Sequence, residues 1–170
     1  DLAIAKPSMT CHPFLHVLSA FHQPAKKADR SFWTHNQNNP VVNSWRGFAF
    51  ENVCFNHIEE IKKALGISGV RTTHSAWSKR GDDNDGTQID LLIDRNDGVI
   101  NLCEMKYTKV PFQIDADYEA NLLNKRKRFI ETTHTPKAIH ITMVCSQGLG
   151  HNSYAEEIQS QVTGGDLFAE

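Results

Sequence analysis

The clearest pattern of hydrophobic and polar positions lies in residues 87–107, where two short segments alternate with a period of two. The first segment, 87–95, places an apolar residue at every second position. In the second, 99–106, Ile100 and Leu102 have the same parity as Glu104 and Lys106. Such alternation is typical of β-strands that bury one face. The chain therefore predicts two paired strands with charged side chains on a face that would otherwise be apolar.

Residues 96–98, with the sequence Asn-Asp-Gly, separate these two predicted strands. A three-residue hairpin loop ends in a left-handed residue, for which glycine is favoured, and Gly98 is the third residue here. This loop places Asp90 directly opposite Glu104, with Cβ atoms roughly 4.5–5.5 Å apart. A two-residue loop would instead place Cys103 opposite Asp90 and separate the two carboxylates onto different faces. We favour the three-residue loop.

The rest of the pattern predicts three helices and two further strands. An apolar stripe predicts a helix over 45–65 that ends at Gly66, and a second helix over 116–132 begins at an acidic cap, Asp115 or Asp117. The remaining elements are a strand over 70–79, a strand over 137–145 next to the hairpin, and a last helix from the capping-box sequence 153–156 to about residue 162. This order predicts an α/β fold with a mixed central β-sheet flanked by helices.

Two facing carboxylates with a nearby lysine indicate a specific chemistry. Mg²⁺ binds through one or two carboxylates together with waters and phosphate oxygens, and a bound cation would turn the repulsion between Asp90 and Glu104 into coordination. Lys106 would then orient or deprotonate an attacking water, or stabilise charge on a phosphate. For an isolated Glu-x-Lys, a solvated pair on an edge strand is the better interpretation; with Asp90 and the hairpin it is not.

A third acid, Glu51, falls on the apolar stripe of the first predicted helix, one turn before Cys54. An acid on an apolar face is costly unless it has a partner. The pattern leaves two alternatives open. Glu51 either reaches the exposed edge of its helix and pairs with a lysine, or it has another partner.

The spacing of Asp90, thirteen intervening residues and Glu104-Met-Lys106 resembles the PD-(D/E)XK nuclease superfamily. A longer set of segments is similar to the C-terminal nuclease-like domain of bacterial and archaeal AAA-type ATPases. Its segments are Trp-Arg-Gly-Phe-Ala-Phe-Glu at 45–51, Ile-Lys-Lys-Ala-Leu-Gly-Ile at 61–67, Gln-Ile-Asp-Leu-Leu-Ile-Asp-Arg at 88–95, Asn-Leu-Cys-Glu-Met-Lys at 101–106 and Asp-Leu-Phe at 166–168. The resemblance covers about residues 31–168.

This resemblance implies a restriction-endonuclease-like core and a metal-dependent deoxyribonuclease. It implies Mg²⁺ or Mn²⁺ bound by Asp90, Glu104 and the backbone carbonyl of Cys103, with Lys106 acting on the hydrolytic water. Glu51 would complete or support that site. Weaker nucleic-acid-binding candidates are Lys125, Tyr118 and Gln88. The implied partners are DNA and an ATPase domain in the same or another chain.

Length, composition and charge limit the possible domain organisation and function but do not decide between the interpretations of the site. The 170 residues suggest one domain, with an irregular segment or linker at 1–40 and the nuclease-like domain at 41–170. A net charge of −2 argues against a surface that binds DNA over most of its area, although a local basic face is compatible with it.

The sequence contains no membrane-spanning apolar run and no Walker-type phosphate loop. The helix at 116–132 contains four consecutive basic residues at 125–128, which cannot all face one ligand.

Four widely spaced cysteines, without a Cys-x-x-Cys, are expected to be reduced core thiols of a cytoplasmic protein. Irregularly spaced histidines at 12, 16, 22 and 35 are expected to be solvated or capping residues. His151 and Asn152 are expected to precede the last helix, where they would either approach a phosphate or simply cap it.

Two alternatives to a nuclease remain. The nuclease fold can serve as an interaction or regulatory module that binds an ATPase, another copy or nucleic acid without cleaving it. The acids can also form a purely structural cluster, for which metal would have no effect on stability.

Overall fold

The structure is a computed structural model of the chain, and it describes residues 39–80 and 86–169. The expectations for residues 1–38, including Cys11 and the early histidines, and for the polar loop at 81–85 lie outside the described residues. The chain divides into two units, 1–49 and 50–170, and the boundary falls inside the first described helix. The fold described below is that of residues 50–169, together with the local structure of this helix.

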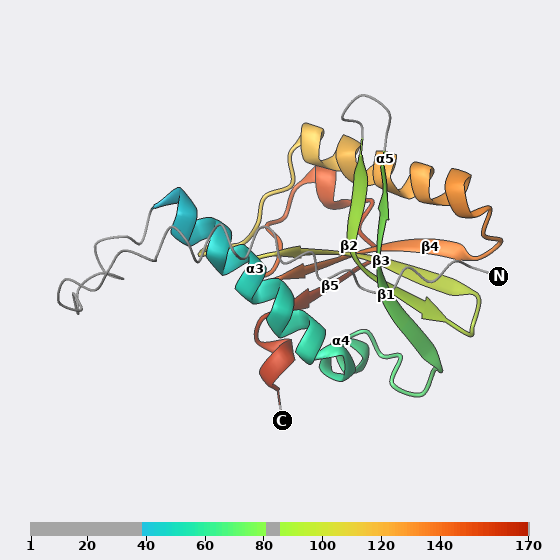
Figure 1. The fold of residues 1–170 in the computed structure, drawn as a ribbon. Helices are drawn as coiled ribbons and strands as arrows, with labels where there is room; N and C mark the ends of the chain where they lie inside the picture. The colour runs from blue at the N-terminus through green and yellow to red at the C-terminus, as the bar shows by residue number, and fades with distance from the viewer. Residues whose placement is uncertain (1–38, 81–85, 170) are drawn as a thin grey trace, which may run out of the picture. The chain divides into compact units, whose positions relative to one another are not determined.

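The centre of the fold is one five-stranded mixed sheet with the order β1-β2-β3-β4-β5. Strand β3 pairs antiparallel with β2 and parallel with β4, which pairs parallel with β5. The strands are β1 (Thr72–Lys79), β2 (Thr87–Arg95), β3 (Val99–Lys106), β4 (Ala138–Cys145) and β5 (Ser160–Thr163). The predicted mixed sheet is thus confirmed (Figure 1).

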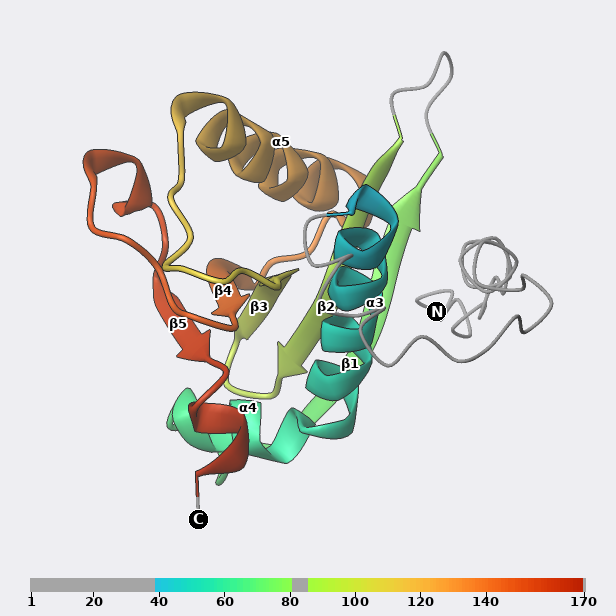
Figure 2. The ribbon, with the colours of Figure 1, turned by 90° about the vertical axis from the view of Figure 1, so that its left-hand side faces the viewer.

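Helices cover both faces of the sheet, as the two views in Figures 1 and 2 show. Helix α5 (Ala116–Thr133) lies on one face, where its Leu122 and Phe129 are buried. Helix α4 (Ile58–Ala64) and the short helix η3 (Asp166–Phe168) lie on the other, with the end of α3 (Pro40–Asn56) contributing Phe50 and Cys54 to the same core cluster. The result is an α/β sandwich with apolar layers on both sides of the sheet.

The hairpin of β2 and β3 has the predicted three-residue loop. Gly98 has φ 86°, the left-handed conformation that glycine adopts without steric cost. The paired positions Leu91–Cys103, Leu92–Leu102 and Asp94–Ile100 follow the register that this loop sets. The prediction of the loop and of its register is confirmed.

The single helix expected over 45–65 is wrong, because the chain forms two helices that separate at His57. The His57 backbone N–H donates to the Cys54 carbonyl, three residues back, and a ring nitrogen of His57 lies 2.8 Å from the Val53 carbonyl. This tightened turn ends α3 before α4 begins. The predicted stop at Gly66 is confirmed, since Gly66 has φ 69°.

The last predicted helix is also wrong. Only Ser153–Ala155 form a 3-10 helix, named η2, and Ser160–Thr163 form strand β5 instead. The expected cap is not made, because the Asn152 amide donates to the Ile114 carbonyl at 2.7 Å, and η2 has no side-chain cap. Val162 is completely buried in the core beneath the sheet, which favours the strand.

Candidate active site

Asp90 lies where the pairing of β2 with β3 ends. The last paired position is Leu91 with Cys103, so Asp90 does not pair with Glu104 as the sequence predicted. A bulge in β2 lies at the same place, because the register with β1 shifts between Leu92 and Ile89. Leu92 and Ile89 pack in one core cluster, whereas Leu91 packs in the other. This extra residue breaks the alternation of β2 beside Asp90.

The Asp90 carboxylate nevertheless reaches β3. Its Oδ2 accepts a hydrogen bond from the backbone N–H of Met105 at 3.0 Å. A side chain therefore takes the place where a carbonyl of a regular neighbouring strand would bind this donor. Because Met105 directly follows Glu104, the two carboxylates still meet at one end of the hairpin, although by a different route from the one predicted.

Glu104 is the most buried charged residue of this cluster, with only 2% of its surface exposed. Its Oε1 lies 2.6 Å from Nζ of Lys125, which extends from α5. Burial and, secondarily, the charge of Asp90 raise the pKa of Glu104 to about 7, and the opposing effects of Lys125 and Lys106 do not cancel this rise. The neutral and ionised forms of Glu104 are therefore close in free energy near neutral pH.

Glu51 joins the same group of charges from the end of α3. Burial raises its pKa, the Asp90 carboxylate raises it further, and Lys106 lowers it. Cys54, one turn later, is completely buried, and burial followed by the charges of Glu51 and Asp90 raises its pKa to about 12. Glu51 thus lies within electrostatic range of both an acid, Asp90, and a lysine, Lys106.

Lys106 is the last residue of β3, and its Nζ lies 5.3 Å from the centre of the Tyr118 ring. This is a cation–π arrangement, which holds the ammonium beside the acids. The Tyr118 hydroxyl is buried and has no hydrogen-bond partner among the described residues. Burial raises its pKa, and so do the charges of Glu104 and Asp90. A buried hydroxyl without a partner is destabilising, and this one lies within electrostatic range of both carboxylates.

Most of the predicted site residues thus come together: Asp90, Glu104, Lys106, Glu51, Lys125 and Tyr118. Gln88 is exposed on β2 and pairs with Ser78 of β1, two residues before Asp90. Cys103 is buried in β3 directly before Glu104. The backbone N–H of Met105 was missed, because neither composition nor periodicity shows where a strand will bulge.

The remaining basic residues of α5 point to other partners. Arg126 pairs with Glu157 at 3.2 Å, Lys127 approaches Glu131 at 3.9 Å, and Arg128 donates to the Thr87 hydroxyl at 3.3 Å. As the sequence predicted, the four consecutive cations do not share one ligand. Lys125 contacts an acid of the cluster, Glu104.

The donor set fits Mg²⁺ or Mn²⁺. It consists of two carboxylates, on Asp90 and Glu104, and a backbone carbonyl of β3, all of them hard oxygen ligands of the kind that these ions prefer. Within 39–80 and 86–169, no three His, Cys, Asp or Glu side chains converge on one point. Mg²⁺ often uses only one or two carboxylates and completes its coordination with waters and phosphate oxygens. The Lys125 ammonium already occupies a cation position on Glu104.

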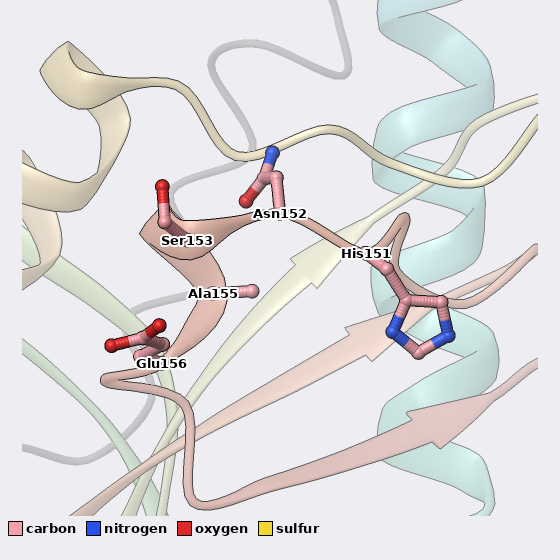
Figure 3. A pocket seen from close by; sticks show the side chains of 5 residues that line it. All are labelled: His151, Asn152, Ser153, Ala155 and Glu156. Atoms are coloured by element: carbon pink, nitrogen blue, oxygen red, sulfur yellow. The ribbon is translucent and has the colours of Figure 1, made fainter.

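A shallow hollow of about 510 Å³ lies elsewhere, lined by His151, Asn152, Ser153, Ala155 and Glu156. Figure 3 shows that these side chains point in different directions rather than toward a common centre. The last helix, whose start was expected to face a phosphate or to be capped here, is replaced by η2, a 3-10 helix of three residues. No predicted member of the acidic site lines this hollow.

Comparisons with known proteins do not assign the chain to a family. No family model matches it, and no curated protein matches it. A solved structure described as a protein of unknown function, AF1548, is similar at 12% identity with a TM-score of 0.44. That match covers 65% of this chain and 56% of the other. In the part of the chain that the structure describes, no helix is long and apolar enough to cross a membrane.

Proposed function

We propose that this protein is a Mg²⁺- or Mn²⁺-dependent phosphodiesterase that cleaves DNA. The observation that supports this most directly is the buried Glu104 beside Asp90, with lysines on two sides. Two acids held close together in a poorly solvated place repel each other unless a cation lies between or beside them. A site of this kind is suited to a divalent cation and a phosphate.

The location agrees with this proposal. β3 and β4 are parallel and end together, with Lys106 paired to Cys145. The loops that follow them also lie side by side, since the Thr108 N–H donates to the Ser146 hydroxyl at 2.7 Å. Ligands of open α/β sheets bind beyond the carboxyl ends of such strands. A nucleic-acid phosphate would therefore approach at this end of the sheet.

Each residue of the cluster has a separate proposed role. Asp90, Glu104 and the Cys103 carbonyl bind the metal, which when bound would polarise a phosphoryl oxygen and lower the pKa of water. Lys106, held over Tyr118, orients the attacking water or accepts its proton. Glu51 supports the site from α3, and Gln88 contacts the substrate from β2.

The choice of DNA follows the resemblance of the Asp90 and Glu104-Met-Lys106 pattern to PD-(D/E)XK nucleases. The buried free thiols of Cys54, Cys103 and Cys145 agree with a reducing compartment, and we propose that the protein acts in the cytoplasm. An ATPase domain is the proposed partner, on the same chain or another.

The test is incubation of the protein with circular double-stranded and single-stranded DNA in Mn²⁺, Mg²⁺ or EDTA. We expect metal-dependent cleavage that Lys106→Ala reduces by roughly 10²-fold or more, because loss of a general acid or base has an effect of this size. Lys127→Ala is the matched control, since Lys127 is exposed and approaches Glu131, which is not a residue of the proposed site. A fully active Lys106→Ala variant would contradict the role assigned to Lys106.

A second function has one specific observation in its favour. The Lys125 ammonium neutralises Glu104 without any metal, which is also what a non-cleaving interaction module would require. A folded protein that cuts no nucleic acid in any metal would favour this alternative. Its partner would then be an ATPase, a second copy or uncut nucleic acid.

A further inference from the structure

The ion pair of Lys125 and Glu104 differs from the others in the described part of the chain. Its side chains are 17% and 3% exposed, whereas each of the other ion pairs has one partner that is at least 38% exposed. Exposed ion pairs are screened by water and contribute little. A buried pair is different, because removal of one partner leaves an uncompensated charge.

The contact also selects one lysine from a basic run. Its neighbours Arg126, Lys127 and Arg128 each have another partner, so general basicity of α5 does not explain why Lys125 reaches Glu104. Lys125 stands on a different element from Glu104, 21 residues along the chain. The fold therefore delivers one ammonium group to the most buried acid of the site.

This ammonium and a divalent cation compete for the same carboxylate. Mg²⁺ binds carboxylate oxygens at roughly 2.0–2.1 Å. With Nζ 2.6 Å from Oε1, a cation on Glu104 would lie within a few ångströms of the lysine charge, in a place where little water screens the repulsion. Lys125 has an unbranched flexible side chain and is not fully buried, so its ammonium can move away from Glu104 toward solvent.

We propose that Lys125 is an exchangeable internal cation, which neutralises Glu104 when no metal is bound and leaves it when Mg²⁺ or Mn²⁺ binds. This inference rests on the proposed metal site and adds its regulation. The released ammonium is then free to meet the phosphate that arrives with the substrate. This arrangement keeps the site folded at low metal concentration. It also sets the metal concentration above which Mg²⁺ or Mn²⁺ replaces the ammonium and occupies the site.

The test measures metal affinity without any nucleic acid. Mn²⁺ is titrated calorimetrically into the wild type and into Lys125→Met, which keeps the length of the side chain but removes its charge. Lys125→Met is expected to bind Mn²⁺ on the order of tenfold more tightly, because the competing charge is gone. Lys127→Met is the matched control on the same helix and should bind as the wild type does, and Lys125→Arg, which keeps the cation, should not gain affinity.

Thermal unfolding gives a second readout. In EDTA, Lys125→Met should unfold at a lower temperature than the wild type, since Glu104 is then buried without its partner, and Mn²⁺ should raise its unfolding temperature by more than that of the wild type. If Lys125→Met does not fold without metal, Lys125→Gln takes its place, because its amide still donates a hydrogen bond to Glu104.

The outcomes separate this inference from the proposed function. Unchanged or weaker Mn²⁺ binding by Lys125→Met overturns the inference and leaves the metal site of the wild type intact. Failure of the wild type and all variants to bind Mn²⁺ overturns both. Binding by Lys125→Met alone overturns the exchange, because Lys125 of the wild type then does not leave Glu104, and it favours the non-cleaving alternative.

Discussion

Glu104 shows how one residue can combine a structural and a chemical requirement. It is buried on β3 with an ammonium on one side and a carboxylate nearby, and its pKa rises to about 7. For an acid, a folded-state pKa above the usual value means that folding favours the protonated form. The stability that this contributes is complete below about pH 4.5 and is lost as pH rises through about 7.

A pH titration of stability tests this directly. In EDTA, the free energy of unfolding should fall between about pH 5 and pH 8, with Glu104 responsible for roughly 2–3 kcal/mol of the change. Glu104→Gln stays neutral at every pH and should remove this part of the slope. Denaturant unfolding at several pH values measures both proteins; equal slopes for the two would show that Glu104 does not titrate in this range.

At this scale the sequence predicted the identities of the reactive residues better than their geometry. Asp90, Glu104, Lys106 and Glu51 were all singled out, and their charges act on one another in the structure. The hydrogen bond from Met105 to Asp90 was not foreseen. Three consecutive apolar residues of β2, 91–93, do not show which of them lies on which face, and the bulge becomes visible only where β1 pairs with β2.

Among the elements, the β2–β3 hairpin was predicted most accurately, because its loop has few conformations and a strict demand for glycine. Gly98 meets that demand with φ 86°, and its carbonyl accepts the N–H of Ala138 at 3.0 Å, where β4 begins. The loop therefore fixes the register of the hairpin and also the start of the parallel neighbour.

Gly98→Ala should lower the free energy of unfolding by about 1–2 kcal/mol, because a side chain is strained in the left-handed conformation. Gly69→Ala is a suitable control, since an added Cβ there meets no atom within 4 Å and the backbone is not left-handed. Urea unfolding of both variants provides the comparison. An equal loss at the two positions would contradict the importance assigned to the turn.

The elements that were predicted wrongly were either too short or interrupted. Strand β5 has four residues, three of them polar, and a segment of this length cannot be distinguished from a helix by period. The break at His57 depends on contacts of its backbone and ring with the preceding turn. Both depend on details of packing and hydrogen bonding that an apolar stripe does not contain.

For the molecule as a whole, the acidic site lies where both layers of the sandwich reach the sheet. Lys125 and Tyr118 come from α5 on one face, and Glu51 comes from the end of α3, whose apolar residues pack on the other. Asp90 and Glu104 belong to the sheet itself. A cation bound here would lie among residues of four elements, β2, β3, α3 and α5. It would stabilise the whole fold because the unfolded chain has no such site.

Metal addition and removal should therefore change the unfolding temperature. With Mn²⁺ about a hundredfold above its dissociation constant, binding stabilises by about 2.7 kcal/mol, which corresponds to a rise on the order of 5–10 °C. EDTA should reverse the rise, and Asp90→Asn, with one ligand charge removed, should show a smaller one. A thermal shift that is the same in wild type and Asp90→Asn would place the metal elsewhere.

The contact between Asp90 and the Met105 N–H affects how mutagenesis of this protein should be interpreted. Because this carboxylate completes the hydrogen bonding of the sheet, Asp90→Ala would remove a ligand and also leave a backbone donor of β3 without its partner. Inactivity of Asp90→Ala could thus result from the lost hydrogen bond in the sheet as well as from the lost carboxylate charge. Only a substitution that keeps an acceptor oxygen at this position, as asparagine does, separates the architectural task of the residue from its chemical one.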